Sequence, residues 1–506
     1  MAIRACAVVF ASLYAWACVA HGRATGFYAP LDDFWGNAFA ANTWAWVASL
    51  QWNGFFPPGY PTVLSVLPGS RLVESAFFFN VLLGVALMLI VWASVRRLSA
   101  EPAALASMAL VAVHPVVLTQ VLTTGADALL VALAVAGALA LFHSATGAKP
   151  GLYLAVAAGV LLGSSGWVRY HGFVFSGAAL VAALLVGGRP SFWRVVVAAV
   201  PVALSGGLLI ALGIAAGDPG RMQRAQGFNV YKGLVGPVNW FHLDAAALPK
   251  TVGEAIARDP DTFWRNYLAF SAPHLWLLIP VAVAIVVSSG RVRRLAVFVA
   301  VCGTVFVPIV NVGASPRGIA PIVPLVLLAM TLAAAGVVSR LPVRGHRRAA
   351  AGALAVAAFT YAAIAWWPPT RDHVVSTRFR AQVAMQIEER LRAERVRFGA
   401  QVFADNDFYF VHADGWQAAT YHPRVLGGWP SLDLAGYEEL YPPPSTQSLD
   451  QFLTDCQKVG VTHLVLTSAA TLVLPDLGKL FAGSLVSSRV VDVPAIPGVR
   501  IFRLVG

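Results

Sequence analysis

The stretch TTGADALLVALAV, residues 123–135, holds the pattern that decides the fold of this 506-residue chain, because one acid is followed by an unbroken apolar run. The run continues to about residue 143, close to the roughly 20 residues that an α-helix needs to cross a bilayer core. Asp127 would then lie in the first turn of a membrane-spanning helix, where a carboxylate offsets the helix dipole. Apolar runs of similar length recur along the chain.

The composition supports the same interpretation for the whole chain. Hydrophobic residues make up 58% of it and charged residues only 12%, about half the charged fraction of a soluble domain. The sequence therefore predicts a polytopic α-helical membrane protein. We expect about eleven transmembrane helices, near residues 4–20, 72–95, 102–119, 126–143, 151–166, 172–187, 195–216, 266–288, 295–311, 318–338 and 349–367.

The net charge of +12 indicates membrane orientation rather than nucleic-acid binding, because the basic residues cluster in short links between apolar runs. The bias predicts a cytoplasmic N-terminus and two long extracytoplasmic loops near residues 21–71 and 217–265. The excess of Arg over Lys and the abundant Ala fit a GC-rich bacterial genome, so we expect a bacterial inner-membrane protein. Residues 4–20 are either an uncleaved first span or a signal peptide cleaved after Ala20. Both alternatives leave the first long loop outside.

The last part of the chain has the pattern of a small α/β domain. We divide the chain into a transmembrane domain, residues 1–369, and an extracytoplasmic domain, residues 370–506. In the second domain, residues 376–396 are helical in pattern, and Ser448 and Gln451 form a capping box that predicts a helix ending near Gly460. The segments AQVFAD, VTHLVLTS, RVVDV and VRIFRLV are typical of strands.

Three acids are candidate catalytic residues on the extracytoplasmic side. Asp32 and Asp33 are adjacent in the first long loop, and Asp127 opens the fourth span. A solvated surface pair and a helix-capping acid are the structural alternatives for these residues. A carboxylate at a membrane boundary nevertheless costs free energy and often marks a functional site.

Basic residues on the same side, where the orientation rule disfavours them, are candidates for binding a phosphate. They lie between the fifth and sixth spans, in the second long loop, and before the tenth span: Arg169, His171, Arg221, Arg224, Lys232, His242 and Arg317. The alternatives are snorkelling to lipid headgroups for Arg169 and Arg317, and a basic loop on anionic lipid for the residues of the second loop.

These motifs together resemble the GT-C glycosyltransferases, polytopic enzymes that take sugars from polyprenyl-phosphate donors. The layout is similar to the protein O-mannosyltransferases and to the aminoarabinose-type sugar transferases of bacterial envelopes. The resemblance rests on the acidic pair Asp32-Asp33, the stretch FFPPGYP before the second span, Asp127, RYHG after the fifth span and PRGIAPIVP before the tenth. The family pair is usually Asp-Glu, so Asp33 departs from it. The proline-rich stretch is expected to hold the chain in turns.

The resemblance implies transfer of a sugar from a polyprenyl-phosphate donor to an envelope acceptor hydroxyl, with inversion. Asp32 would be the base, assisted by Asp33 and Asp127, and the basic residues would bind the donor phosphate. The acceptor would be a glycan, lipid or protein. No cofactor besides the lipid-linked donor is certain. Three acids near a phosphate could hold a divalent ion, whereas no His or Cys spacing predicts zinc.

Three other functions stay open from the sequence. A transporter or flippase for lipid-linked glycans would also carry ionisable residues, although transporters place them at mid-membrane and contain internal repeats. An envelope polysaccharide polymerase or ligase would act on whole lipid-linked glycans. A scaffold of the same fold that has lost catalysis would keep the layout alone.

Overall fold

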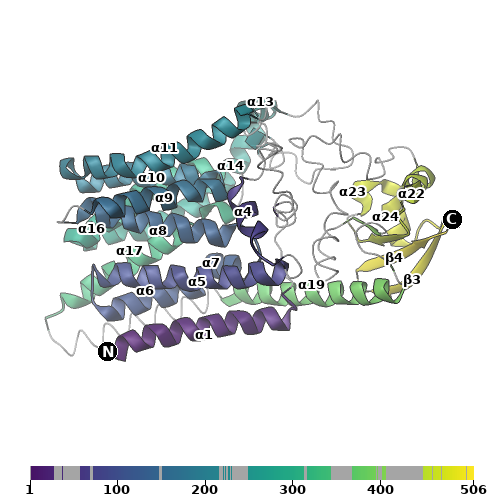
Figure 1. Ribbon diagram of the computed structural model, residues 1–506, viewed down its shortest axis with the longest axis horizontal. Coiled ribbons are helices and arrows are strands. Elements are labelled where there is room, and N and C mark those ends of the chain that lie inside the picture. Colours follow the sequence, from purple (N-terminus) through teal and green to yellow (C-terminus); the bar gives the residue numbers. More distant parts are fainter. Residues whose placement is uncertain are drawn as a thin grey trace.

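The computed structural model confirms a polytopic helical membrane protein with a small C-terminal α/β region (Figure 1). It describes residues 2–27, 37, 57–68, 72–147, 151–215, 220, 223, 226–227, 230, 249–312, 316–342, 367–394, 396, 402–405, 448–458, 460–468, 470–496 and 498–505. Within these ranges, seven helices are long and apolar enough to cross a membrane, or eight if one bent pair counts as a single span. The predicted span at 349–367 lies almost wholly outside the described residues.

Every other predicted span coincides with a helix or a helix pair, because long apolar runs can satisfy their backbone in lipid only as helices. The single helices are α1 (Ala2–Ala24), α5 (Leu72–Arg96), α8 (Asp127–Thr146), α9 (Leu152–Val168), α10 (His171–Gly187), α11 (Phe192–Ala215), α16 (Gly290–Asn311) and α17 (Ile322–Ser339). The span predicted at 266–288 is α14 (Pro260–Leu275), a 3-10 turn and α15 (Ile279–Val287). With α9 and α10 shorter than the rest, the total of eleven crossings stays a prediction.

The span predicted at 102–119 is not one straight helix. It consists of α6 (Glu101–Val113) and α7 (Pro115–Leu122), which meet at a bend of 60°. Pro115 has no N–H to donate and forces His114 into an extended conformation, with φ −67° and ψ 127°. The ring Nδ1 of His114 then accepts the Val116 N–H at 3.3 Å and begins α7.

Helix α8 is the centre of the bundle and its sequence explains why. Alanines and one glycine allow neighbouring helices to approach closely, so most of α8 is buried. A Cβ on Gly137 would lie 2.8 Å from Leu162 of α9. On the far side of α9, a Cβ on Gly159 would lie 2.3 Å from the Ala198 carbonyl oxygen of α11.

The end of the proline-rich stretch enters a short helix, where the sequence predicted turns; Pro57 and Pro58 lie before this helix. Helix α4 (Gly59–Ser65) has Pro61 in its first turn, where the missing N–H leaves no helical hydrogen bond unmade. Tyr60 and Leu64 are buried against Ala126 before α8 and Val168 at the end of α9. A Cβ on Gly59 would lie 2.6 Å from the Trp167 carbonyl oxygen, so the backbone of α4 touches the end of α9.

The C-terminal region is a four-stranded sheet with helices on both faces. The strands β1 (Val402–Ala404), β2 (His463–Leu466), β3 (Val490–Ile496) and β4 (Val499–Leu504) lie in the order β1-β2-β4-β3. The β1-β2 pair is parallel and the other two pairs are antiparallel. One face packs on α19 (Trp367–Ala393) through Val383, Ile387 and Leu391, and the other packs on α22 (Leu449–Lys458) and α24 (Pro475–Ala482).

Helix α19 joins this region to the bundle (Figure 1). It begins nine residues before the predicted helix. Pro368 and Pro369 do not prevent this earlier start, because they lie in the first turn, where proline is tolerated. Val374 packs with Cys18 of α1 and Leu122 of α7, and the other end of α19 covers the sheet. The sheet therefore lies beyond the end of the bundle at which α7 ends and α8 begins.

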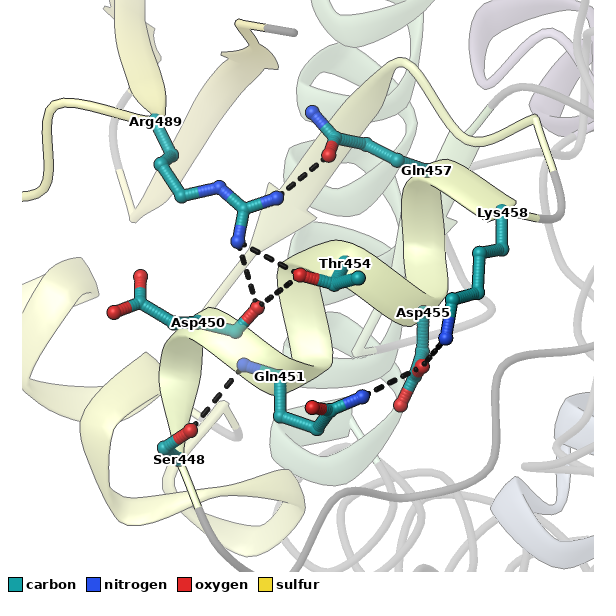
Figure 2. Close-up of polar contacts among 8 residues, drawn as sticks. All are labelled: Ser448, Asp450, Gln451, Thr454, Asp455, Gln457, Lys458 and Arg489. Carbon is teal, nitrogen blue, oxygen red and sulfur yellow. Dashed lines mark hydrogen bonds and ion pairs between the residues drawn. The ribbon is translucent and has the colours of Figure 1, made fainter.

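The predicted cap at the start of α22 is confirmed in its first half, because the Gln451 N–H donates to Ser448 Oγ at 3.2 Å. The Gln451 side chain does not complete the predicted box and instead donates from Nε2 to Asp455 Oδ1 at 2.9 Å. Figure 2 shows how α22 is tied to the sheet. Arg489, directly before β3, donates to the Asp450 carbonyl oxygen and to Thr454 Oγ1, both at 2.8 Å, and to Gln457 Oε1 at 2.6 Å. This network ties α22 to the start of β3, which is an edge strand of the sheet.

Asp405 links the carboxyl ends of the two parallel strands. Its Oδ2 accepts the Thr467 N–H at 2.7 Å and the Thr467 hydroxyl at 2.9 Å. Burial raises the pKa of the Asp405 carboxyl from 3.8 to about 6, against the opposite effect of these hydrogen bonds. The folded state therefore binds the proton more tightly than the unfolded chain does.

This pKa predicts the pH dependence of the C-terminal region. The contribution of Asp405 to the free energy of unfolding is largest below pH 3.8. About 3 kcal/mol of this contribution is lost as the pH rises through 6. Asp405→Asn lacks this loss, so its stability relative to wild type should grow between pH 4 and 7. Alkylation of the buried Cys456 thiol, followed by peptide mass spectrometry, measures opening of this region. Asp476→Asn, at a partly exposed acid, should instead follow wild type at each pH.

Candidate functional site

Asp127 is a buried carboxylate at the first position of α8. Its side chain is 1% exposed, and the residue before it, Ala126, provides no side-chain cap for the helix. The carboxylate belongs to the first turn, at the amino end of α8, where the helix dipole favours negative charge. Burial at this depth requires cations close by, because an uncompensated carboxylate in an apolar interior costs several kcal/mol.

Two arginines from distant parts of the chain supply that charge. Arg169 Nε lies 2.9 Å from Asp127 Oδ1, and Arg317 Nη1 lies 3.6 Å from Asp127 Oδ2. The arginine side chains are 20% and 32% exposed, so they connect the buried carboxylate to the surface. We call these three residues the Asp127 cluster. The structure thus brings together three of the predicted site residues.

Short links place both arginines at the same end of the bundle as Asp127. Arg169 and Tyr170 are the entire link between α9 and α10, and the Arg169 N–H donates to the Ser165 carbonyl oxygen at 3.0 Å to end α9. Arg317 lies in the 3-10 turn Pro316–Ile319 before α17. These are the helix boundaries at which the sequence predicted the two residues.

The charge of the Asp127 cluster is positive. Two guanidinium groups and one carboxylate give a net charge of +1, and the amino end of α8 adds its partial positive charge. His171, the first residue of α10, lies within electrostatic range of both arginines. A guanidinium has five N–H donors in a fixed fork, so an arginine oriented by a carboxylate can also bind phosphate oxygens. The cluster is therefore suited to attract an anion.

One residue that the sequence analysis missed supports this site. Asn80, in the middle of α5, is completely buried and donates from Nδ2 to the Thr123 carbonyl oxygen at 2.6 Å. The carbonyl oxygens of Gln120 and Gly125 lie 3.5 Å and 3.4 Å from the same nitrogen. The available signal was an amide with apolar residues on both sides, in the run FFFNVLL, since polar residues inside membrane helices usually bind another helix or serve function.

The other predicted site residues lie outside the described part of the chain. They are Asp32, Asp33, Arg221, Arg224, Lys232 and His242. Among the described residues, no group of three His, Cys, Asp or Glu side chains could hold a metal ion. A divalent ion near the three acids therefore stays a prediction that depends on the first loop.

A comparison with protein-family models supports the resemblance found in the motifs. Residues 64–215 match the family described as dolichyl-phosphate-mannose-protein mannosyltransferase. The matched segment includes Asp127 and Arg169 and covers less than a third of the chain. Over this segment the similarity to GT-C glycosyltransferases is confirmed. No curated protein matches the chain.

The similarity to solved structures is weaker than the match to the family model. ArnT from Cupriavidus metallidurans, in a crystal structure bound to undecaprenyl phosphate, has 15% sequence identity and a TM-score of 0.49, over 98% of this chain and 97% of ArnT. The archaeal oligosaccharyltransferase AglB from Archaeoglobus fulgidus, in complex with an inhibitory peptide and a dolichol-phosphate, has 13% identity and a TM-score of 0.46, over 94% of this chain and 70% of AglB.

Proposed function

We propose that this protein is a membrane glycosyltransferase that moves a sugar from a polyprenyl-phosphate donor to an acceptor hydroxyl at the extracytoplasmic face of a bacterial inner membrane. The observation that carries the proposal is the Asp127 cluster, in which three residues from separate chain segments form a positively charged site at one end of the bundle. The family match over residues 64–215 supports the donor class, because its description names a dolichyl-phosphate sugar.

The donor explains why cations belong at this place. A polyprenyl chain cannot leave the bilayer, so its phosphate must be bound at the membrane boundary. When the bond between the sugar and the phosphate breaks, negative charge grows on the phosphate oxygens. Fixed positive charge stabilises that transition state without a general acid, since a phosphate is already a stable anion. Arg169 and Arg317 supply this charge, together with Arg221, Arg224 and Lys232 of the second long loop.

The acceptor requires a base. As its hydroxyl oxygen attacks the anomeric carbon, the O–H proton passes to a carboxylate, which we assign to Asp32. The new C–O bond forms on the face opposite the phosphate, which leaves with the electron pair of the broken bond. The configuration at the anomeric carbon is therefore inverted. Asp33 orients the acceptor, and Asp127 holds the two arginines in position for the phosphate.

We also propose an orientation for the chain in the membrane and a role in acceptor binding for its C-terminal region. The N-terminus is cytoplasmic, and residues 370–506 form an extracytoplasmic domain that helps to hold the acceptor. Its place beyond the α4 end of the bundle supports this assignment (Figure 1). A divalent ion bound by the acids would add to the charge that arginines provide on the phosphate.

The test is identification of the lipid followed by a transfer assay. Mass spectrometry of the gently purified protein should detect a polyprenyl phosphate or its sugar derivative. Liposomes that contain this lipid-linked sugar should then yield a glycosylated acceptor and free polyprenyl phosphate in equal amounts. Movement of the intact donor between leaflets without cleavage would instead identify a flippase and refute the proposal. Transfer of a whole glycan chain would identify a polymerase or ligase.

A further inference from the structure

We propose that Asn80 is a positioning residue for the Asp127 cluster, and this inference rests on the function proposed above. The Asn80 amide bonds backbone carbonyl groups rather than the charged side chains of the cluster. It acts on the backbone of residues 123–126, the turn that joins α7 to α8 and ends directly before Asp127.

The Asn80 side chain provides a hydrogen-bond donor at the buried end of α7. Helix α7 ends at Leu122, so its last carbonyl groups have no helical partner. This end of the helix is packed inside the bundle, where Gln120, Val121 and Leu122 are buried and little water can replace a lost partner. The Asn80 amide nitrogen lies within 3.5 Å of three carbonyl oxygens from this region, and closest to that of Thr123. The Asn80 side chain of α5 therefore holds carbonyl groups on both sides of the α7 end in place.

The turn determines where the Asp127 carboxylate lies. Ala126 is the last residue of the turn, and its carbonyl oxygen accepts the Leu130 N–H at 3.0 Å, which starts the α8 hydrogen bonds. A shift of the turn would therefore shift Asp127 relative to Arg169 and Arg317, which other helices hold in place. The 2.9 Å and 3.6 Å distances leave little room for such a shift before the ion pairs break.

The proposed role of Asn80 requires a hydrogen-bond donor in the side chain. The atoms around Asn80 Nδ2 are carbonyl oxygens, so only a side chain with an N–H or O–H can bind them. Leucine has a similar size and shape but no donor. Glutamine keeps the amide on a chain one methylene longer. The two substitutions therefore separate the loss of the donor from a change of volume.

The experiment measures sugar transfer by full-length variants in liposomes, per amount of folded protein. Asn80→Leu should lower kcat by about 10²-fold with a smaller change in KM, because misplaced arginines no longer match the charge that develops on the phosphate. Asn80→Gln should recover part of that loss. Ser107→Ala, which removes a buried side-chain hydrogen bond to the Ala103 carbonyl oxygen in α6, should retain wild-type kcat.

A second arm separates positioning from general stability. If Asn80 acts through Asp127, Asn80→Leu should lower transfer by less than about twofold when added to Asp127→Asn, since the cluster is already broken. Equal factors in both backgrounds would refute positioning, as would full kcat in folded Asn80→Leu.

A third experiment does not depend on sugar transfer by the protein. Hydrogen–deuterium exchange of the amides of residues 123–130 should accelerate in Asn80→Leu and stay at the wild-type rate in Ser107→Ala. If wild type transfers no sugar, the proposed function fails while this arm still tests the contact. Unchanged exchange in Asn80→Leu would refute the inference even if the enzyme is active.

Discussion

Replacing Asp127 by Asn is expected to reduce sugar transfer by about 10²-fold or more and to lower the free energy of unfolding of the bundle. The carboxylate is buried and lies between two guanidinium groups. Its loss leaves Arg169 and Arg317 without their shared counter-charge, and the two cations then repel each other. Transfer per folded molecule and the midpoint of thermal unfolding in detergent measure the two effects.

The matched control for this change is Glu101→Gln. Glu101 also forms an ion pair, with Arg96 at 3.1 Å, but both side chains are about one-third exposed, and such pairs contribute little to stability. This variant should retain transfer and unfold at the wild-type temperature. Adding Arg169→Gln to Asp127→Asn should restore part of the stability, because it removes the repulsion between the two guanidinium groups that Asp127 no longer bridges. Wild-type kcat and stability in Asp127→Asn would show that the cluster has neither role.

Replacing Asp32 by Asn is expected to lower kcat by about 10²–10⁴-fold with little change in KM for the donor. An amide cannot accept the proton of the acceptor hydroxyl, whereas donor binding depends on the basic residues. Asp33→Asn should have a smaller effect, because its proposed role is to orient the acceptor. Asp33→Glu, which restores the pair usual in the resembling family, should remain active. Steady-state transfer at a series of donor concentrations measures kcat and KM.

Asp372→Asn is the control for this pair, since Asp372 is an exposed acid beside Arg371 with no proposed role in transfer. It should behave like wild type. If Asp33→Asn abolished transfer while Asp32→Asn preserved it, the base would be the second acid of the pair. Full transfer by a variant that lacks both acids would exclude carboxylate catalysis from the first loop.

The helical part of the fold could be predicted because its cause is local. An apolar run near 20 residues can satisfy its backbone in lipid only as a helix, and α5, α8 and α17 begin within a few residues of the predicted positions. The Ser448 cap at the start of α22 was also predictable, as the two residues that form it lie within four positions. Pro115 was visible in the sequence, but the size of the 60° bend depends on how α6 and α7 pack.

The sequence by itself determined that this is a helical membrane protein and placed Asp127, Arg169 and Arg317 at helix boundaries, because hydrophobic length and charge position are properties of each segment alone. Only the tertiary structure decided that these three residues meet, that α4 packs beside them and that Asn80 holds the turn before Asp127. These contacts join residues more than 30 positions apart, so they depend on the packing order of the helices. The hydropathy of each helix is compatible with many such orders, and the close approaches at Gly137 and Gly159 fix one of them through shape.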